Sequence, residues 1–397
     1  MYNNLLDSLS DYPFQRLNGL LSGVTRKNAS APTIMLSIGE PQHKTPDLLH
    51  VALAKHANGW NKYPPTNGTA EFRGAVADWL TRRYCLEPSF IDPDQHILPV
   101  AGTREGLFMA AQLTVPRTKN GRRPVVLIPN PFYQVYFGAA IMAGAEPVFV
   151  PAIRENGYQP NWKDMRADCL GRAALAYICT PSNPQGTAAS LDLLIDAISL
   201  ARANDFVLVS DECYSEIYYD KPPPSAIEAC ASLGGSLKNV LVFNSLSKRS
   251  NSPGLRSGFV SGDPDLVTKL ALLRAHGGPA QPLPVLAAAS VLWKDEGHVK
   301  ENQALYREKF DDAATIFGDR FEFYKPDGGF FLWLRVDDGI EATQTLWREA
   351  GIRVLPGAFL AKADQNGINP GAPYIRLALV HGRAETAAAL NRINDLL

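Results

Sequence analysis

The feature that most constrains the fold is a series of short apolar runs separated by helical patterns and turns. Such runs occupy residues 124–128, 174–179, 206–209 and 240–243, with the length and residue types of buried strands. Between the second and third, residues 190–203 begin with a serine cap and carry Leu and Ile at helical spacing. This alternation predicts an α/β chain with a mostly parallel mixed sheet.

Polar residues and turn formers follow each of these runs directly. The four segments are Pro-Asn-Pro-Phe-Tyr at 129–133, Thr-Pro-Ser-Asn-Pro-Gln-Gly at 180–186, Asp-Glu-Cys-Tyr at 211–214 and Asn-Ser-Leu-Ser-Lys at 244–248. Open α/β sheets bind ligands beyond the carboxyl ends of their strands. We therefore expect the four segments to meet at one binding crevice.

The pattern changes after about residue 300. A charged helix at 299–310, an apolar strand at 329–336, a helix at 340–350 and a strand at 374–379 indicate a smaller α+β layer. The first 45 residues are too short and too rich in Pro and Gly to form their own core. We therefore predict a large domain over residues 46–298 and a small domain formed by residues 1–45 and 299–397.

Composition narrows the function further. The 397 residues are 46% hydrophobic with a formal charge of −1, and no basic cluster suited to nucleic acid or an anionic membrane is present. The chain has neither a leader-like start nor an apolar stretch of membrane-spanning length. Its five scattered cysteines suggest a cytoplasmic protein without a metal site, and a nicotinamide fingerprint is missing.

Lys248 is the first candidate for chemistry, because it follows a strand expected to be buried on both faces. A lysine there is costly unless its charge is paired or its pKa is lowered. A desolvated amine is a good nucleophile toward carbonyl groups. The alternative is an ordinary surface lysine.

A phosphate site is predicted nearby. Arg256 lies eight positions after Lys248, and with the hydroxyls of Ser245 and Ser247 it offers a guanidinium fork to a phosphate dianion. Gly102 precedes a helix starting at Thr103, whose free N–H groups would face an anion. A plain helix start is the alternative for this turn.

The remaining candidates suit a planar heterocycle. Asp211 ends a buried strand and needs a cationic partner such as a protonated pyridine nitrogen, although a helix cap is the alternative. Asn183 and Tyr214 offer donors to a phenolate oxygen beside an imine. Tyr133 offers a ring for stacking, but its neighbour Phe132 could equally face the ligand.

The segments 181–186, 211–214, 245–248 and 254–258, in this order and spacing, resemble the class I/II aminotransferases of pyridoxal 5′-phosphate (PLP) fold type I. The resemblance spans nearly the whole chain. It implies that Lys248 is the Schiff-base lysine, that Asp211 binds the pyridine nitrogen, and that Asn183 and Tyr214 bind the phenolic oxygen. It implies phosphate contacts from Thr103, Arg104, Ser245 and Arg256.

Three further positions match this family more loosely. The resemblance implies that Gly39, with Asn183, lies near the substrate, and that Tyr63 reaches the phosphate of the neighbouring subunit in a homodimer. Arg376 on the late strand would hold the α-carboxylate of an amino-acid or keto-acid substrate, as a planar fork can. A solvated charge on an edge strand is the alternative for Arg376.

Three segments resemble the bacterial N-succinyldiaminopimelate aminotransferases of lysine biosynthesis: 101–106, 274–279 and 293–299. The resemblance implies N-succinyl-L,L-2,6-diaminopimelate and 2-oxoglutarate as substrates, with Arg104 and His276 as candidates for binding the distal carboxylates. Two alternatives are an aminotransferase for aspartate, alanine or aromatic donors and a β-lyase of the same fold. A PLP-binding regulator would need a DNA-binding segment, which we do not find.

Overall fold

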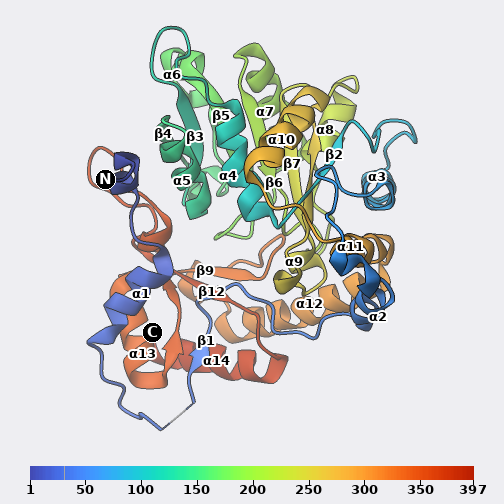
Figure 1. Ribbon diagram of the computed structural model, residues 1–397. Coiled ribbons are helices and arrows are strands. Elements are labelled where there is room, and N and C mark those ends of the chain that lie inside the picture. The colour runs from blue at the N-terminus through green and yellow to red at the C-terminus, as the bar shows by residue number, and fades with distance from the viewer. Residues whose placement is uncertain (31) are drawn as a thin grey trace.

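A seven-stranded mixed sheet forms the centre of the larger part of the molecule (Figure 1). This computed structural model describes residues 1–30 and 32–397. The strand order is β2-β8-β7-β6-β5-β3-β4, and only β8 runs antiparallel to its neighbours. The strands are β2 (Ile97–Val100), β3 (Val125–Asn130), β4 (Glu146–Pro151), β5 (Ala173–Cys179), β6 (Val207–Asp211), β7 (Val240–Ser245) and β8 (Gly258–Gly262). The predicted mostly parallel sheet is confirmed.

Helices cover both faces of this sheet. Alternate residues of β5 point to opposite sides, so that Ala176 and Ile178 join one hydrophobic core while Leu175 and Tyr177 join the other. Burial on both faces explains why these strands are continuous apolar runs in the sequence. The first core contains α2 (Asp47–Lys55), α3 (Ala70–Arg83), α6 (Ala167–Arg172), α7 (Leu191–Ala203), α8 (Ala226–Ser232) and α11 (Leu283–Lys294); the second contains α4 (Thr103–Thr114), α5 (Gln134–Met142) and α10 (Pro264–Gly277).

A smaller part combines the two ends of the chain. In Figure 1 the blue N-terminal and red C-terminal segments lie together below the large sheet. Ile34 and Leu36 share a core with residues of α12, α13 and α14, and this contact supports the proposed grouping of residues 1–45 with 299–397. The elements are α1 (Pro13–Ser22), β1 (Ile34–Met35), α12 (Gly297–Phe317), β9 (Phe331–Arg335), α13 (Gly339–Ala350), β10 (Ile352–Arg353), β11 (Leu355–Pro356), β12 (Tyr374–Ala378) and α14 (Arg383–Leu396).

Two local features differ from the expected element bounds. Lys248 lies within a single helical turn, α9 (Leu246–Arg249), which the side chain of Ser245 caps. The strand predicted from residue 329 begins at Phe331, because Gly329 has a positive φ of 77°. Across the described residues, no helix combines the length and the apolar character that crossing a bilayer requires.

Candidate active site

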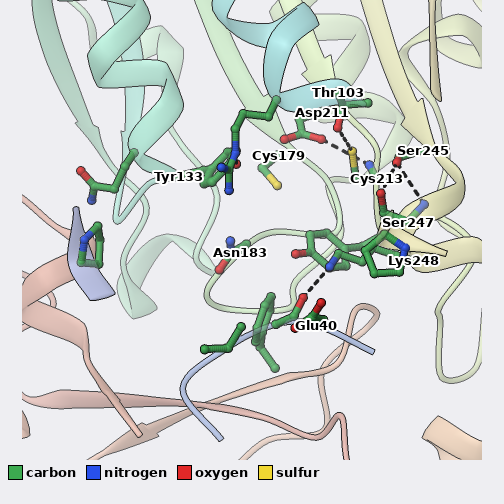
Figure 2. Close-up of a pocket in the computed structure, with 18 of the residues that line it drawn as sticks. Glu40, Thr103, Tyr133, Cys179, Asn183, Asp211, Cys213, Ser245, Ser247 and Lys248 are labelled. Carbon is green, nitrogen blue, oxygen red and sulfur yellow. Dashed lines mark hydrogen bonds between the residues drawn. The ribbon is translucent and has the colours of Figure 1, made fainter. Parts of the chain in front are cut away.

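A cavity of about 400 Å³ opens at the carboxyl ends of β5, β6 and β7, as the sequence predicted. Figure 2 shows side chains from the large sheet on one side and Glu40 on the other. Nearly all of the predicted site residues line it, namely Gly39, Thr103, Arg104, Tyr133, Asn183, Asp211, Tyr214, Ser245, Ser247, Lys248, Arg256 and Arg376. Segments far apart in the sequence therefore meet in one site.

Lys248 projects into this cavity from α9. Its Nζ donates a hydrogen bond to the carbonyl of Gly39 on the opposite wall. Burial lowers the pKa of Lys248 to about 8. An appreciable minority of Lys248 amines is therefore uncharged near neutral pH, which is the form that attacks a carbonyl or accepts a proton.

Asp211 is the last residue of β6, and its side chain is buried. Oδ2 accepts a 2.6 Å hydrogen bond from the phenol of Tyr136, and Oδ1 accepts a 3.3 Å bond from the Cys213 N–H. Burial raises the pKa of Asp211 against the effect of these bonds. A cation in the cavity would hold this carboxylate ionised, as a protonated pyridine ring does.

The side chains of Phe132 and Tyr133 lie in different environments. Phe132 is 1% exposed and packs on Phe149, with ring centroids 5.1 Å apart. Tyr133 lines the cavity, where its phenol oxygen accepts a 2.8 Å hydrogen bond from Arg104 Nε. Tyr133 is therefore the ring that can stack on a ligand, which settles the alternative left open by the sequence.

One end of the cavity suits a phosphate group. Gly102, with φ of 87°, leads into α4, and a Cβ at this position would clash with Arg256 Nη2. Arg256 forms no ion pair with another described residue. The hydroxyls of Ser245 and Ser247 lie 2.9 Å apart on the same wall. A helix start, a guanidinium without an ion-pair partner and two hydroxyls together fit a phosphate dianion.

The other end suits a carboxylate. Arg376 lies on β12, the middle strand of its three-stranded sheet, so the alternative of a solvated edge-strand charge is wrong. Its guanidinium donates to Asn183 Oδ1 at 2.8 Å and to the Ser37 carbonyl at 2.7 Å, while Nε is buried without a partner among the described residues. Burial lowers the pKa of Arg376 to about 10. This cation lacks the anion that a substrate would bring.

Close packing explains why residue 39, whose carbonyl accepts the hydrogen bond from Lys248, is a glycine. A Cβ on Gly39 would approach the Phe331 ring to 2.7 Å. Tyr214 packs edge-on against the same ring, with centroids 5.6 Å apart. Backbone and aromatic rings from both parts of the molecule thus confine the space around the lysine.

Some predicted residues lie elsewhere. Tyr63 is fully exposed and lies outside the cavity lining of this chain. His276 lies exposed in the last turn of α10 and is also outside the lining, so its predicted contact with a distal carboxylate is wrong for a site within one chain. Conversely, the prediction missed Tyr12, Glu40 and Tyr136. Only Tyr136 carried a signal, because it lies one helical turn after Tyr133.

The chain belongs to the family "Aminotransferase class I and II", whose model matches residues 31–393. Members of this family depend on PLP, and this protein is a PLP-dependent aminotransferase of fold type I. The cavity lining fits the cofactor, with a buried carboxylate for the ring nitrogen and an anion site for the phosphate.

Two relatives match this chain over most of its length. The chain is 35% identical over 91% of its length to the 4-dedimethylamino-4-oxo-anhydrotetracycline transaminase OxyQ of Streptomyces rimosus, covering 92% of that protein. It is 30% identical over 98% of its length to the LL-diaminopimelate aminotransferase of Syntrophobacter fumaroxidans, covering 97% of it.

Solved structures agree in fold. An aminotransferase from Neisseria meningitidis is 40% identical, with a TM-score of 0.94 and full coverage of both chains. A probable N-succinyldiaminopimelate aminotransferase from Thermus thermophilus is 26% identical, with a TM-score of 0.84, over 97% of this chain and all of that one.

Proposed function

We propose that this aminotransferase moves the amino group of N-succinyl-L,L-2,6-diaminopimelate to 2-oxoglutarate, a step of lysine and diaminopimelate biosynthesis. The observation that carries the proposal is that the cavity lining contains a second guanidinium besides that of Arg376, namely that of Arg104, without an ion-pair partner among the described residues. Both proposed substrates have a second carboxylate in addition to the one that Arg376 binds.

The chain's own residues divide the work of the reaction. PLP, when bound, supplies the electron-withdrawing ring that makes the substrate α-proton acidic. Asp211 holds the ring nitrogen, and Arg376 orients the α-carboxylate by its planar fork. Lys248 Nζ would accept the substrate α-proton and pass it on during the transfer, which a neutral amine with a pKa of about 8 can do.

Arg104 is placed to bind the distal carboxylate. Its Nε donates to the phenol of Tyr133, and its Nη2 lies 3.5 Å from the phenol of Tyr12, which comes from the N-terminal segment. Arg104 forms no ion pair within the described residues. A guanidinium that two phenols orient and no carboxylate neutralises favours an anionic substrate group.

A second candidate donor is L,L-diaminopimelate without the succinyl group. The printed name of the Syntrophobacter relative favours it. Glu40 also lines the cavity and forms no ion pair among the described residues. An unpaired carboxylate would attract the distal ammonium group of the free diamino acid, which the succinyl amide removes.

The test is kcat/KM for a panel of donors with 2-oxoglutarate fixed, because specificity is a ratio of these values. We expect the succinylated donor to exceed aspartate, alanine and phenylalanine by at least about tenfold. If one of those three were better by tenfold, the proposal would be wrong. Higher values for free L,L-diaminopimelate would select the second candidate.

Arg104→Leu gives an internal control. Loss of one charge-assisted contact should lower kcat/KM for the succinylated donor by about 100-fold, whereas alanine, which has no distal carboxylate, should change little. An equal decrease in kcat/KM for both donors would mean that Arg104 does not bind the distal carboxylate.

We also propose a homodimer with shared active sites. Tyr63 is a fully exposed aromatic side chain, and in the family that the chain resembles its counterpart reaches the partner's phosphate. Light scattering coupled to an activity assay should show that only dimers turn over substrate. A fully active monomer would refute this proposal.

A further inference from the structure

One buried side chain, Gln281, connects the two segments that form the phosphate end of the cavity. Gln281 lies between α10 and α11 and is 3% exposed. Its single amide nitrogen donates to the carbonyl of Val100 and to the carbonyl of Arg256, both at 2.8 Å. Gln281 itself is outside the cavity lining.

The first of these carbonyls, that of Val100, lies just before the N-terminal turn of α4. Val100 ends β2, and Gly102 and the first turn of α4 follow directly. Any movement of the end of β2 would therefore displace the N–H groups of the first turn of α4, which we expect to face the phosphate.

The second carbonyl belongs to a residue in an unfavourable conformation. Arg256 has φ of 54° and ψ of 51°, the left-handed region that a side chain with a Cβ rarely occupies. Such a conformation persists only where surrounding contacts hold it. The bond from Gln281 to the Arg256 carbonyl is one such contact, and the bond from Arg256 Nη1 to the Pro253 carbonyl is another.

The amide oxygen of Gln281 indicates that this residue does more than stabilise the fold. Its Oε1 is buried and has no hydrogen-bond partner among the described residues. A buried acceptor without a partner costs free energy, so a residue selected for stability alone would pair both halves of its amide.

We propose that Gln281 is a positioning residue for the cofactor phosphate. By holding the end of β2 and the backbone of Arg256 with one nitrogen, it fixes the separation between the N–H groups of α4 and the Arg256 guanidinium. This inference rests on the proposed assignment of the phosphate to these two segments.

The test compares two ligands of the apoprotein. PLP and pyridoxal share the ring and the aldehyde, but only PLP has the phosphate. Absorbance titration of Gln281→Leu should show a dissociation constant for PLP raised about tenfold or more, with that for pyridoxal changed less than twofold, since two hydrogen bonds that position the phosphate site are lost.

Gln303→Leu is the matched control. Gln303 is also a buried glutamine whose amide donates to a backbone carbonyl, that of Glu216, but it lies on α12. This variant should leave the ratio of the two affinities unchanged. If Gln281→Leu does not fold, Gln281→Asn keeps the amide but is too short to reach both carbonyls, and it should change the ratio in the same direction.

Arg256→Leu tests the location of the phosphate site separately from the role of Gln281. If Arg256→Leu weakens PLP selectively and neither Gln281 variant does, the role of Gln281 is wrong. Equal weakening of PLP and pyridoxal in the Gln281 variants would also overturn it, because a general structural defect affects both ligands. If Arg256→Leu leaves the ratio unchanged, the phosphate assignment itself is wrong.

Discussion

Tyr136 donates a 2.6 Å hydrogen bond from its phenol to Asp211 Oδ2. The Tyr136 ring is fully buried and stacks on Tyr177, with centroids 4.5 Å apart and an angle of 12° between the planes. Because the stacked ring has little freedom, its hydroxyl fixes the orientation of the Asp211 carboxylate, which we propose faces the cofactor ring nitrogen.

Tyr136→Phe should keep the stacked ring and remove only this bond. We expect the cofactor to be retained and kcat to fall about tenfold to 100-fold, the value of one hydrogen bond to a charged group. Tyr177→Phe is the matched control, because the Tyr177 phenol donates to the Leu107 carbonyl and not to Asp211. Equal kcat in the two variants would contradict the role of Tyr136.

Asp211→Ala should separate cofactor binding from chemistry. The variant retains PLP through the phosphate end of the cavity but loses the protonated ring, so kcat at saturating PLP should fall by several orders of magnitude. Arg256→Ala should behave in the opposite way, with weaker PLP binding and a kcat closer to that of the wild type. Near-normal turnover of Asp211→Ala would show that its assigned role is wrong.

Glu212 should make stability depend on pH. Its buried carboxylate accepts bonds from the Ser210 hydroxyl and the Ala226 N–H, and burial raises its pKa from 4.5 to about 7. The folded state therefore holds this proton at pH values where the unfolded state has lost it. The resulting stabilisation is complete below pH 4.5 and is lost as the pH rises through 7.

Urea unfolding from pH 5 to 8 tests this effect with Glu212→Gln, which cannot titrate. The free energy of unfolding of this variant should fall less between pH 5 and 7 than that of the wild type. Glu71→Gln, at an exposed glutamate of α3, should follow the wild type. Identical pH profiles for Glu212→Gln and the wild type would contradict the prediction.

The sequence predicted the sheet side of the site more completely than the other walls. Asp211 and Lys248 could be found because each directly follows a buried apolar run, and that relation is local. Tyr12 and Glu40 reach the cavity only because the N-terminal segment packs beside β12, a long-range contact that no spacing encodes. Strands β2 and β8 were missed because they are short and contain Pro99 or Gly258.

Packing rather than pattern decided two further cases. Phe132 and Tyr133 are adjacent, so the sequence alone left either ring free to face the ligand, and contact with Phe149 sends Phe132 into the core. The predicted role of His276 came from the resemblance of segment 274–279, but the His276 side chain is exposed on α10 and lies outside the cavity lining.

Lys248 is the lysine that we propose binds the cofactor. A second buried lysine, Lys309, is the strictest comparison for this assignment. Lys309 is 1% exposed, and burial lowers its pKa to about 7, so it is also a nucleophilic amine. Its Nζ donates to the carbonyls of Leu379 and His381, however, and it lies outside the cavity lining.

Borohydride reduction of the PLP-bound protein, followed by proteolysis and mass spectrometry, compares the two lysines directly. We predict a pyridoxyl group on the peptide that contains Lys248 and none on the peptide that contains Lys309, and we expect Lys248→Ala to lose both the label and turnover. A label on Lys309 or on any other lysine, with Lys248 unmodified, would contradict the account.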